Sequence, residues 1–128
     1  MAVPDVALRF LAALNHGDVE AARGCYHPDA EIWHDFDGVT QTVDQNMALM
    51  AAMGRRALRR EYVIRRLEPI EGGYLQQHTL EITTLGGQDL VAEAIALVSV
   101  GDDGLIHRLE EWINPASVSY THLRAHET

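Results

Sequence analysis

The chain has 128 residues, of which 47% are apolar and 23% are charged, a composition typical of one folded domain rather than a disordered, collagen-like or coiled-coil chain. Its 19 acidic and 10 basic residues give a net charge of −9, so neither nucleic acid nor an anionic membrane is an expected partner. All ten basic residues are arginines, which excludes Schiff-base and phosphate-loop lysines.

Cysteine content and hydropathy bear on location. The single cysteine, Cys25, excludes an internal disulfide and any zinc site with several thiolates, and it is compatible with a reducing compartment. The N-terminus lacks a charged segment followed by an apolar one, and the longest apolar runs are only a few residues. We therefore expect a cytoplasmic protein.

Two helices are predicted near the N-terminus. Apolar residues at helical spacing follow Pro4 and predict a first helix that Gly17 closes. Asp18 is the expected N-cap of a second helix that runs through Cys25. The His-Pro-Asp segment at 27–29 is expected to end that helix as a turn.

A strand and a third helix are predicted next. Residues 30–36 alternate in polarity with period two, which is typical of a strand and places His34 on its more apolar face. The Thr-Val-Asp-Gln sequence at 42–45 matches a capping box and begins a helix that Gly54 is expected to close. That helix carries a methionine stripe expected to be mainly core: Met47, Met50 and Met53.

The rest of the chain is predicted to be sheet. Four runs rich in β-branched and aromatic residues are separated by glycine-containing turns, at 59–69, 74–84, 90–100 and 105–113. Helices followed by an antiparallel meander indicate an α+β domain whose helices cover one face of a curved sheet. This domain is expected to span residues 1–116.

Residues 118–128, VSYTHLRAHET, do not continue this pattern. All eleven resemble one reading frame of a transposase-based sequencing adaptor, which implies a metagenomic gene fragment whose own sequence ends near Ala116. The alternative is an ordinary flexible C-terminus. We therefore interpret residues 117–128 as a non-native or flexible tail, and we do not count His122 and His126 as candidate ligands.

The segment FLAALNHGDVEAARGCYHPDAEIWH and the closing strand DDGLIHRLEEWINPA resemble the SnoaL-like branch of the nuclear transport factor 2-like superfamily. The resemblance covers residues from about Val6 to Pro115. It implies a cone-shaped, strongly curved antiparallel sheet around a pocket that the N-terminal helices close. The superfamily includes ketosteroid isomerase, limonene epoxide hydrolase, polyketide cyclases and scytalone dehydratase, together with members that only bind or interact. The fold alone does not select among these functions.

Catalytic positions of these relatives transfer only in part. The ketosteroid isomerase tyrosine falls on Phe10, its general base on His34 and its protonated aspartate near Ala96, so its oxyanion hole is missing. The Asp-Arg-Asp relay of limonene epoxide hydrolase is also broken, because its positions fall on or near His78, Leu80 and Glu111. SnoaL-type cyclases place an acidic base on the closing strand with a histidine nearby, and Glu111 and His78 could fill those roles.

Alternation along the closing strand predicts the surroundings of Glu111. If Glu111 faces the pocket, then His107, Leu109 and Ile113 share its face. Apolar neighbours disfavour the charged carboxylate, so we expect a raised pKa and a base able to abstract a proton next to a carbonyl. The alternative is a buried structural contact with His78 or an arginine.

His34 also has two interpretations, an acid–base group or a satisfied structural residue. The ligand types of His34, His78 and Glu111 match a two-histidine, one-carboxylate metal site, but their spacing supplies no geometry, and we expect no metal ion and no cofactor. The predicted catalytic residues are therefore Glu111, His78 and His34. The predicted pocket wall consists of Phe10, Trp33, Phe36, Met50, Gln76, Leu80, Ala96, Leu109 and Ile113.

Two functions remain in view. The first is acid–base chemistry of the isomerase, cyclase or hydrolase type on a small, mostly apolar carbonyl compound. The second is ligand binding without turnover, or a homodimeric interaction module. The outer sheet face, expected to carry Trp112, Val63 and Leu67, predicts a two-fold homodimer in either case.

Overall fold

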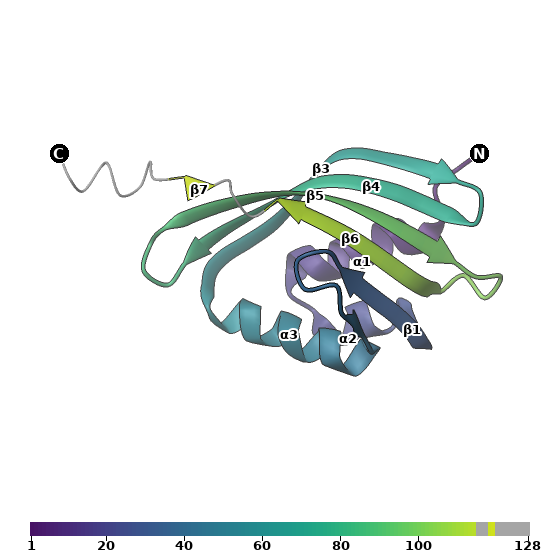
Figure 1. Ribbon diagram of the computed structural model, residues 1–128, viewed down its shortest axis with the longest axis horizontal. Coiled ribbons are helices and arrows are strands. Elements are labelled where there is room, and N and C mark those ends of the chain that lie inside the picture. Colours follow the sequence, from purple (N-terminus) through teal and green to yellow (C-terminus); the bar gives the residue numbers. More distant parts are fainter. Residues whose placement is uncertain (115–117, 120–128) are drawn as a thin grey trace.

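The computed structural model describes residues 1–114 and the backbone of Val118–Ser119 (Figure 1). The elements in chain order are α1 (Asp5–His16), α2 (Val19–Arg23), β1 (Tyr26–His34), β2 (Thr40–Gln41), α3 (Val43–Arg55), β3 (Ala57–Ile70), β4 (Gly73–Thr84), β5 (Asp89–Val100), β6 (Ile106–Asn114) and β7 (Val118–Ser119). The sheet order is β2-β1-β6-β5-β4-β3, and β7 pairs with β5. The three helices lie together on one side of the arched sheet.

The first two helices begin and end largely where the sequence predicts. Gly17 closes α1 in the left-handed conformation (φ 66°), and its N–H bonds to the carbonyls of the last turn. The Asp18 side chain caps α2 by accepting the Ala21 N–H at 3.0 Å. The predicted turn at 27–29 is wrong, because these residues belong to β1. Pro28 fits there since the β1 register to β6 is irregular between Tyr26 and Glu31, where no ladder donor is needed.

The third helix begins with the predicted capping box. The Thr42 hydroxyl accepts the Gln45 N–H, and the Gln45 side chain accepts the Thr42 N–H at 2.9 Å. Gly54 does not close this helix, contrary to the prediction. Its φ angle is not positive, and the helix continues to Arg55 with Arg56 as its C-cap.

The α+β class and the curved sheet are confirmed. Strands β3 to β6 form the expected antiparallel meander, joined by short turns. One pair differs from an all-antiparallel sheet, because β1 runs parallel to β6 and makes the sheet mixed. This pairing brings the first and the last long strand side by side, and it aligns His34 with Glu111.

The hydrophobic core lies between the helices and the sheet. Its largest fully buried side chains come from α1, α3 and four strands: Tyr74, Ile32, Met47, Ile106, Val6 and Val98. Phe10 of α1 packs edge-on against Tyr26 of β1, with ring centroids 5.2 Å apart. Helix α1 is thus fixed to the strand that carries His34.

No helix among the described residues is long and apolar enough to cross a membrane. Within the predicted tail, the backbone of Val118 and Ser119 pairs with Leu90 and Asp89 of β5. The remainder of that tail, with His122 and His126, lies outside the described residues.

Candidate functional site

A cavity of about 450 Å³ lies between the sheet and the helices. Its wall combines side chains of α1 and α3 with inward-facing side chains of β1 and β3 to β6. This volume falls within the range of small-molecule pockets, and most of the lining is apolar. The few polar side chains in the wall therefore decide what the cavity can do chemically.

Most of the predicted pocket wall lines this cavity: Phe10, Phe36, Met50, Gln76, Leu80, Ala96, Leu109 and Ile113. Trp33 is the exception. It lies next to Trp112, with ring centroids 5.5 Å apart, and Trp112 is 42% exposed. Because Ile32 and His34 on either side line the cavity, alternation turns Trp33 to the outer face of the sheet.

The structure brings together the three residues predicted to be catalytic. Oε1 of Glu111 lies 3.3 Å from Nε2 of His34, and Oε2 lies 3.2 Å from Nε2 of His78. All three residues line the cavity, and the His78 side chain is only 2% exposed. One carboxylate is therefore held through both oxygens by two imidazoles.

The sheet register explains how three strands reach one point. His34 is the direct partner of Glu111 in the parallel β1–β6 ladder. His78 lies on β4, one strand beyond β5, and the β5 residues between the two groups are Ala94 and Ala96. Because these alanines are small and buried, His78 can reach across β5 to Glu111.

Gln76 extends the cluster by one hydrogen bond. Its Nε2 lies 3.1 Å from Nδ1 of His78, two residues along the same face of β4. An amide nitrogen can only donate, so Nδ1 of His78 accepts and the His78 proton resides on Nε2, facing Glu111. The resulting chain of donors runs from Gln76 through His78 to the carboxylate. Nδ1 of His34, by contrast, has no hydrogen-bond partner within residues 1–114.

The raised pKa predicted for Glu111 is wrong. Burial does favour the neutral acid, but the hydrogen bonds from His34 and His78, with the positive charge of these rings when protonated, outweigh it. The pKa of Glu111 is consequently lowered from its ordinary value of 4.5. The apolar neighbours along β6 favour the neutral acid, but the two donors on β1 and β4 favour the carboxylate more strongly. Glu111 is thus a stabilised carboxylate at neutral pH.

Tyr62 is a cavity residue that the sequence reasoning missed. Its ring lies 5.4 Å from that of His78, and burial, followed by the nearby Glu111 charge, raises the pKa of Tyr62 to about 12. The hydroxyl therefore stays protonated and can donate to a ligand. Its position on β3 opposite Leu80 could have indicated it, since Leu80 was already assigned to the pocket.

The direction expected for His107 needs correction. His107 does not share the cavity face of Glu111, because a bulge opposite Ser99 and Val100 breaks the alternation and turns His107 outward. The methionine stripe is mainly core, as expected, because Met47 and Met50 both belong to the buried core cluster. Met50 and the partly buried Met53 also line the cavity.

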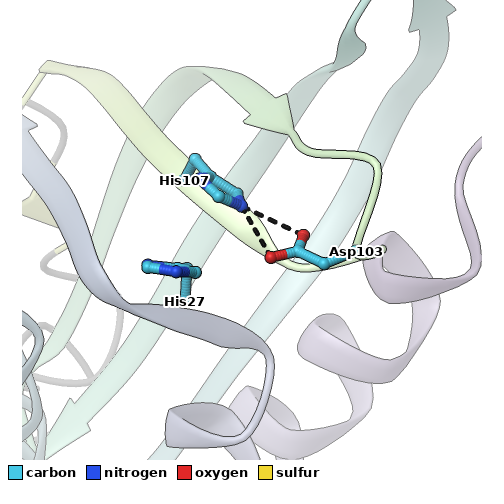
Figure 2. A group of neighbouring side chains, drawn as sticks. All are labelled: His27, Asp103 and His107. Atoms are coloured by element: carbon cyan, nitrogen blue, oxygen red, sulfur yellow. Dashed lines mark hydrogen bonds and ion pairs between the residues drawn. The ribbon is translucent and has the colours of Figure 1, made fainter.

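One group of metal-ligating side chains lies outside the cavity. Among the described residues, only His27, Asp103 and His107 bring three such ligand atoms within 4.8 Å of one another (Figure 2). The cluster of His34, His78 and Glu111 does not meet this spacing. The cavity cluster is therefore better suited to hydrogen bonding than to holding an ion.

Comparison with known proteins relates the chain to one family. Residues 7–109 match the sequence profile of the SnoaL-like domain. No curated protein matches the sequence significantly.

Solved structures share the fold at low sequence identity. A protein from Catenulispora acidiphila with a ketosteroid isomerase-like fold, in complex with trimethylamine, is 13% identical with a TM-score of 0.81, and the match covers 94% of each chain. An epoxide hydrolase from M. tuberculosis that is similar to limonene epoxide hydrolase is 17% identical with a TM-score of 0.75, covering 94% of this chain and 89% of that one. A protein from Shewanella denitrificans described as a SnoaL-like polyketide cyclase is 11% identical with a TM-score of 0.75, covering 94% and 92%.

Proposed function

The chain belongs to the SnoaL-like domain family, and from this premise we propose that its cavity binds a small, mostly apolar carbonyl compound and moves a proton on it. The groups that act are Glu111, His34 and His78. The observation that carries the proposal is the carboxylate of Glu111, held through both oxygens inside a mostly apolar cavity of about 450 Å³. A buried carboxylate that two histidines contact at the wall of a pocket is typical of acid–base sites.

The hydrogen-bond pattern suggests distinct roles for the two histidines. His78 is fixed on both sides, by Gln76 at Nδ1 and by Glu111 at Nε2, so it holds the carboxylate in place. His34 donates from Nε2 to Glu111 and keeps an unprotonated Nδ1 without a partner in the described chain. Nδ1 of His34 can take a proton from a carbon next to a ligand carbonyl, and Glu111 then stabilises the imidazolium that forms. Tyr62 can donate to the ligand oxygen.

The relatives support this chemical class in general terms. The M. tuberculosis structure is described as an epoxide hydrolase and the Shewanella structure as a SnoaL-like polyketide cyclase. At 11–17% identity these likenesses support the fold, and the reaction has to be inferred from this chain's own residues.

A second candidate, ligand binding without turnover, has its own observation. Both Glu111 oxygens are occupied and its pKa is lowered, which makes the carboxylate a weak base. In that case the cluster serves to orient a ligand by hydrogen bonds.

Proton exchange on a bound ketone separates these two functions. The full-length protein is incubated in D₂O with a panel of small cyclic ketones, and deuterium incorporation next to the carbonyl is followed by NMR. We expect exchange that falls by about 10²- to 10⁴-fold in both Glu111→Gln and His34→Ala, with binding retained. The control is Glu110→Gln, the neighbouring residue, which is ion-paired to Arg108. Binding without exchange in the wild-type protein would establish the binding module instead.

We also propose that the outer sheet face pairs two copies of the chain. Trp112 and Ile95 are opposite each other on β6 and β5 and are 42% and 41% exposed, and Trp33 adds to this surface. Leu67, expected on this face, packs against the core instead, because a register shift between Ile64 and Arg66 reverses the alternation.

Light scattering on the full-length protein at micromolar concentration tests the pairing. We expect a dimer that Trp112→Glu converts to a monomer. Leu85→Glu, at a 61% exposed turn position, is the matched control and should leave the dimer intact. A monomeric wild-type protein would refute the pairing.

A further inference from the structure

The outward-facing pair of histidines on β1 and β6 lies beside an aspartate of the β5–β6 loop. Nε2 of His107 is 3.0 Å from Oδ1 and 2.9 Å from Oδ2 of Asp103. The rings of His27 and His107 are stacked with centroids 4.5 Å apart. Figure 2 shows the His107 ring directed at both carboxylate oxygens, with the His27 ring lying beside them. We propose that His27, Asp103 and His107 form a binding site for a divalent transition-metal ion such as Zn²⁺ or Ni²⁺.

The types of ligand fit this class of ion. Two imidazole nitrogens and one carboxylate are preferred by Zn²⁺ and its neighbours, which lie about 2.0–2.2 Å from each such atom. Ligand atoms around a tetrahedral ion are then about 3.3 Å apart, as follows from those bond lengths. The contacts between His107 and Asp103 are already close to that spacing, and all three ligand atoms lie within 4.8 Å. Rotation of the His27 ring out of its stacking on His107 completes the set.

The loop holds Asp103 in position. Oδ1 accepts the Leu105 N–H at 2.9 Å, and the loop is closed by hydrogen bonds between Gly101 N–H and the Leu105 carbonyl (3.0 Å) and between Gly104 N–H and the Gly101 carbonyl (2.9 Å). Gly101 also makes room for the site, because a Cβ there would lie 2.5 Å from Nε2 of His107 and 3.0 Å from Oδ1 of Asp103. The carboxylate is thus preorganised next to the ring nitrogen, which lowers the entropy lost on binding an ion.

The protons can be accounted for at each ligand. Nδ1 of His27 accepts the Asp29 N–H at 3.0 Å, so its lone pair can pass to an ion when that hydrogen bond is exchanged, while Nε2 keeps the proton. The Nε2 lone pair of His107 becomes free when the Nε2 proton moves through solvent to Nδ1 of the same ring, which stays neutral. Asp103 offers a carboxylate oxygen to the ion, and the Leu105 N–H holds that carboxylate in place. The net charge of −9 favours a cation at the surface.

Such an ion would connect β1 to the β5–β6 loop at the end of the parallel ladder. His27 and His107 each follow a residue of the Tyr26–Ile106 pair, so the ion would fix the register at that end. This site is on the outside of the sheet and does not depend on the chemistry proposed for the cavity.

Calorimetric titration of the full-length protein with Zn²⁺ and with Ni²⁺ tests the site. We expect one ion per chain in the wild-type protein and at least about tenfold weaker binding in His107→Ala, in His27→Ala and in Asp103→Asn, the loss typical of disturbing a metal ligand's surroundings. His16→Ala, at an exposed histidine of α1, is a control that should keep full affinity. The double variant His122→Ala/His126→Ala tests the two histidines of the C-terminal tail and should also keep full affinity.

A second measurement separates a built site from loose association. Co²⁺ bound to three protein ligands gives visible d–d absorption, which should appear in the wild-type protein and disappear in His107→Ala. Zn²⁺ should also raise the midpoint of thermal unfolding in the wild-type protein but not in that variant. Absence of binding up to millimolar Zn²⁺, or binding that survives His107→Ala, would overturn the proposal and leave a surface ion pair only.

Discussion

The substitution Glu111→Gln should lower the free energy of unfolding by an amount that follows from the hydrogen bonds of this residue. Glu111→Gln keeps the shape but exchanges one carboxylate oxygen for an NH₂ group, which cannot face an N–H donor. His78 cannot change its tautomer while Gln76 donates to its Nδ1, so the amide oxygen must take the His78 side. The NH₂ group then faces His34, whose unpaired Nδ1 can accept the proton from Nε2 at little cost.

The magnitude follows from the two hydrogen bonds. Both survive, but each changes from a bond to a charged acceptor, worth about 1.5–3 kcal/mol, to a neutral one worth about 0.5–1.5 kcal/mol. Relief of the buried charge offsets part of this loss. We expect a net decrease of about 1–2 kcal/mol in the free energy of unfolding at pH 7, which lowers the thermal midpoint by about 3–8 °C for a domain of this size.

The pH dependence provides the sharper assay. Folding lowers the pKa of Glu111, so the charged carboxylate adds to the free energy of unfolding. This stabilisation is complete above about pH 4.5 and is lost as the pH falls below that value. Urea unfolding at pH 7 and pH 3.5 should show the difference between wild-type protein and Glu111→Gln shrinking at the lower pH. Glu110→Gln, a matched change at a partly exposed ion pair with Arg108, should cost at most about 1 kcal/mol. Equal stability of Glu111→Gln and wild-type protein at pH 7 would refute the reasoning.

Three further outcomes can be measured directly. Gly73→Ala should destabilise the fold by more than about 3 kcal/mol in urea unfolding, because the new Cβ would lie 1.8 Å from the Val98 carbonyl oxygen, whereas Gly86→Ala meets no atom closer than 3.9 Å and serves as the control. Thr42→Ala should cost about 1 kcal/mol through loss of the capping box, and an unchanged thermal midpoint would contradict that role. Tyr62 should not ionise below about pH 11, which an ultraviolet titration of the wild-type protein and of Tyr62→Phe can measure. A step near pH 10 that only the wild-type protein shows would belong to Tyr62 and would contradict its raised pKa.

Local sequence signals predicted most of the fold. The helix stop at Gly17, the cap at Asp18 and the capping box at Thr42 depend on contacts within a few residues, and all three are observed. The meander could be predicted because its turns are short and rich in glycine. The parallel β1–β6 pairing depends on which distant strands meet, which no local pattern specifies.

The sequence indicated most of the residues that line the cavity, but not the direction of every side chain or the pKa of Glu111. Period-two alternation placed Leu109, Glu111 and Ile113 on one face correctly, and it failed for His107 because a bulge is set by tertiary pairing. The direction of the Glu111 pKa could not be deduced either. It depends on whether hydrogen-bond donors reach the carboxylate, and His78 does so from two strands away.

The parallel ladder between β1 and β6 also has a consequence for how the protein folds. His34 and Glu111 are cross-strand partners, so the contact that assembles the cavity cluster joins the first and last long strands, whose Glu31 and Arg108 are 77 residues apart in sequence. Closing so long a loop is entropically expensive, and such contacts form slowly. A chain still emerging from the ribosome cannot form this cluster before β6 has been synthesised. The proposed chemistry therefore becomes available only when the last strand docks.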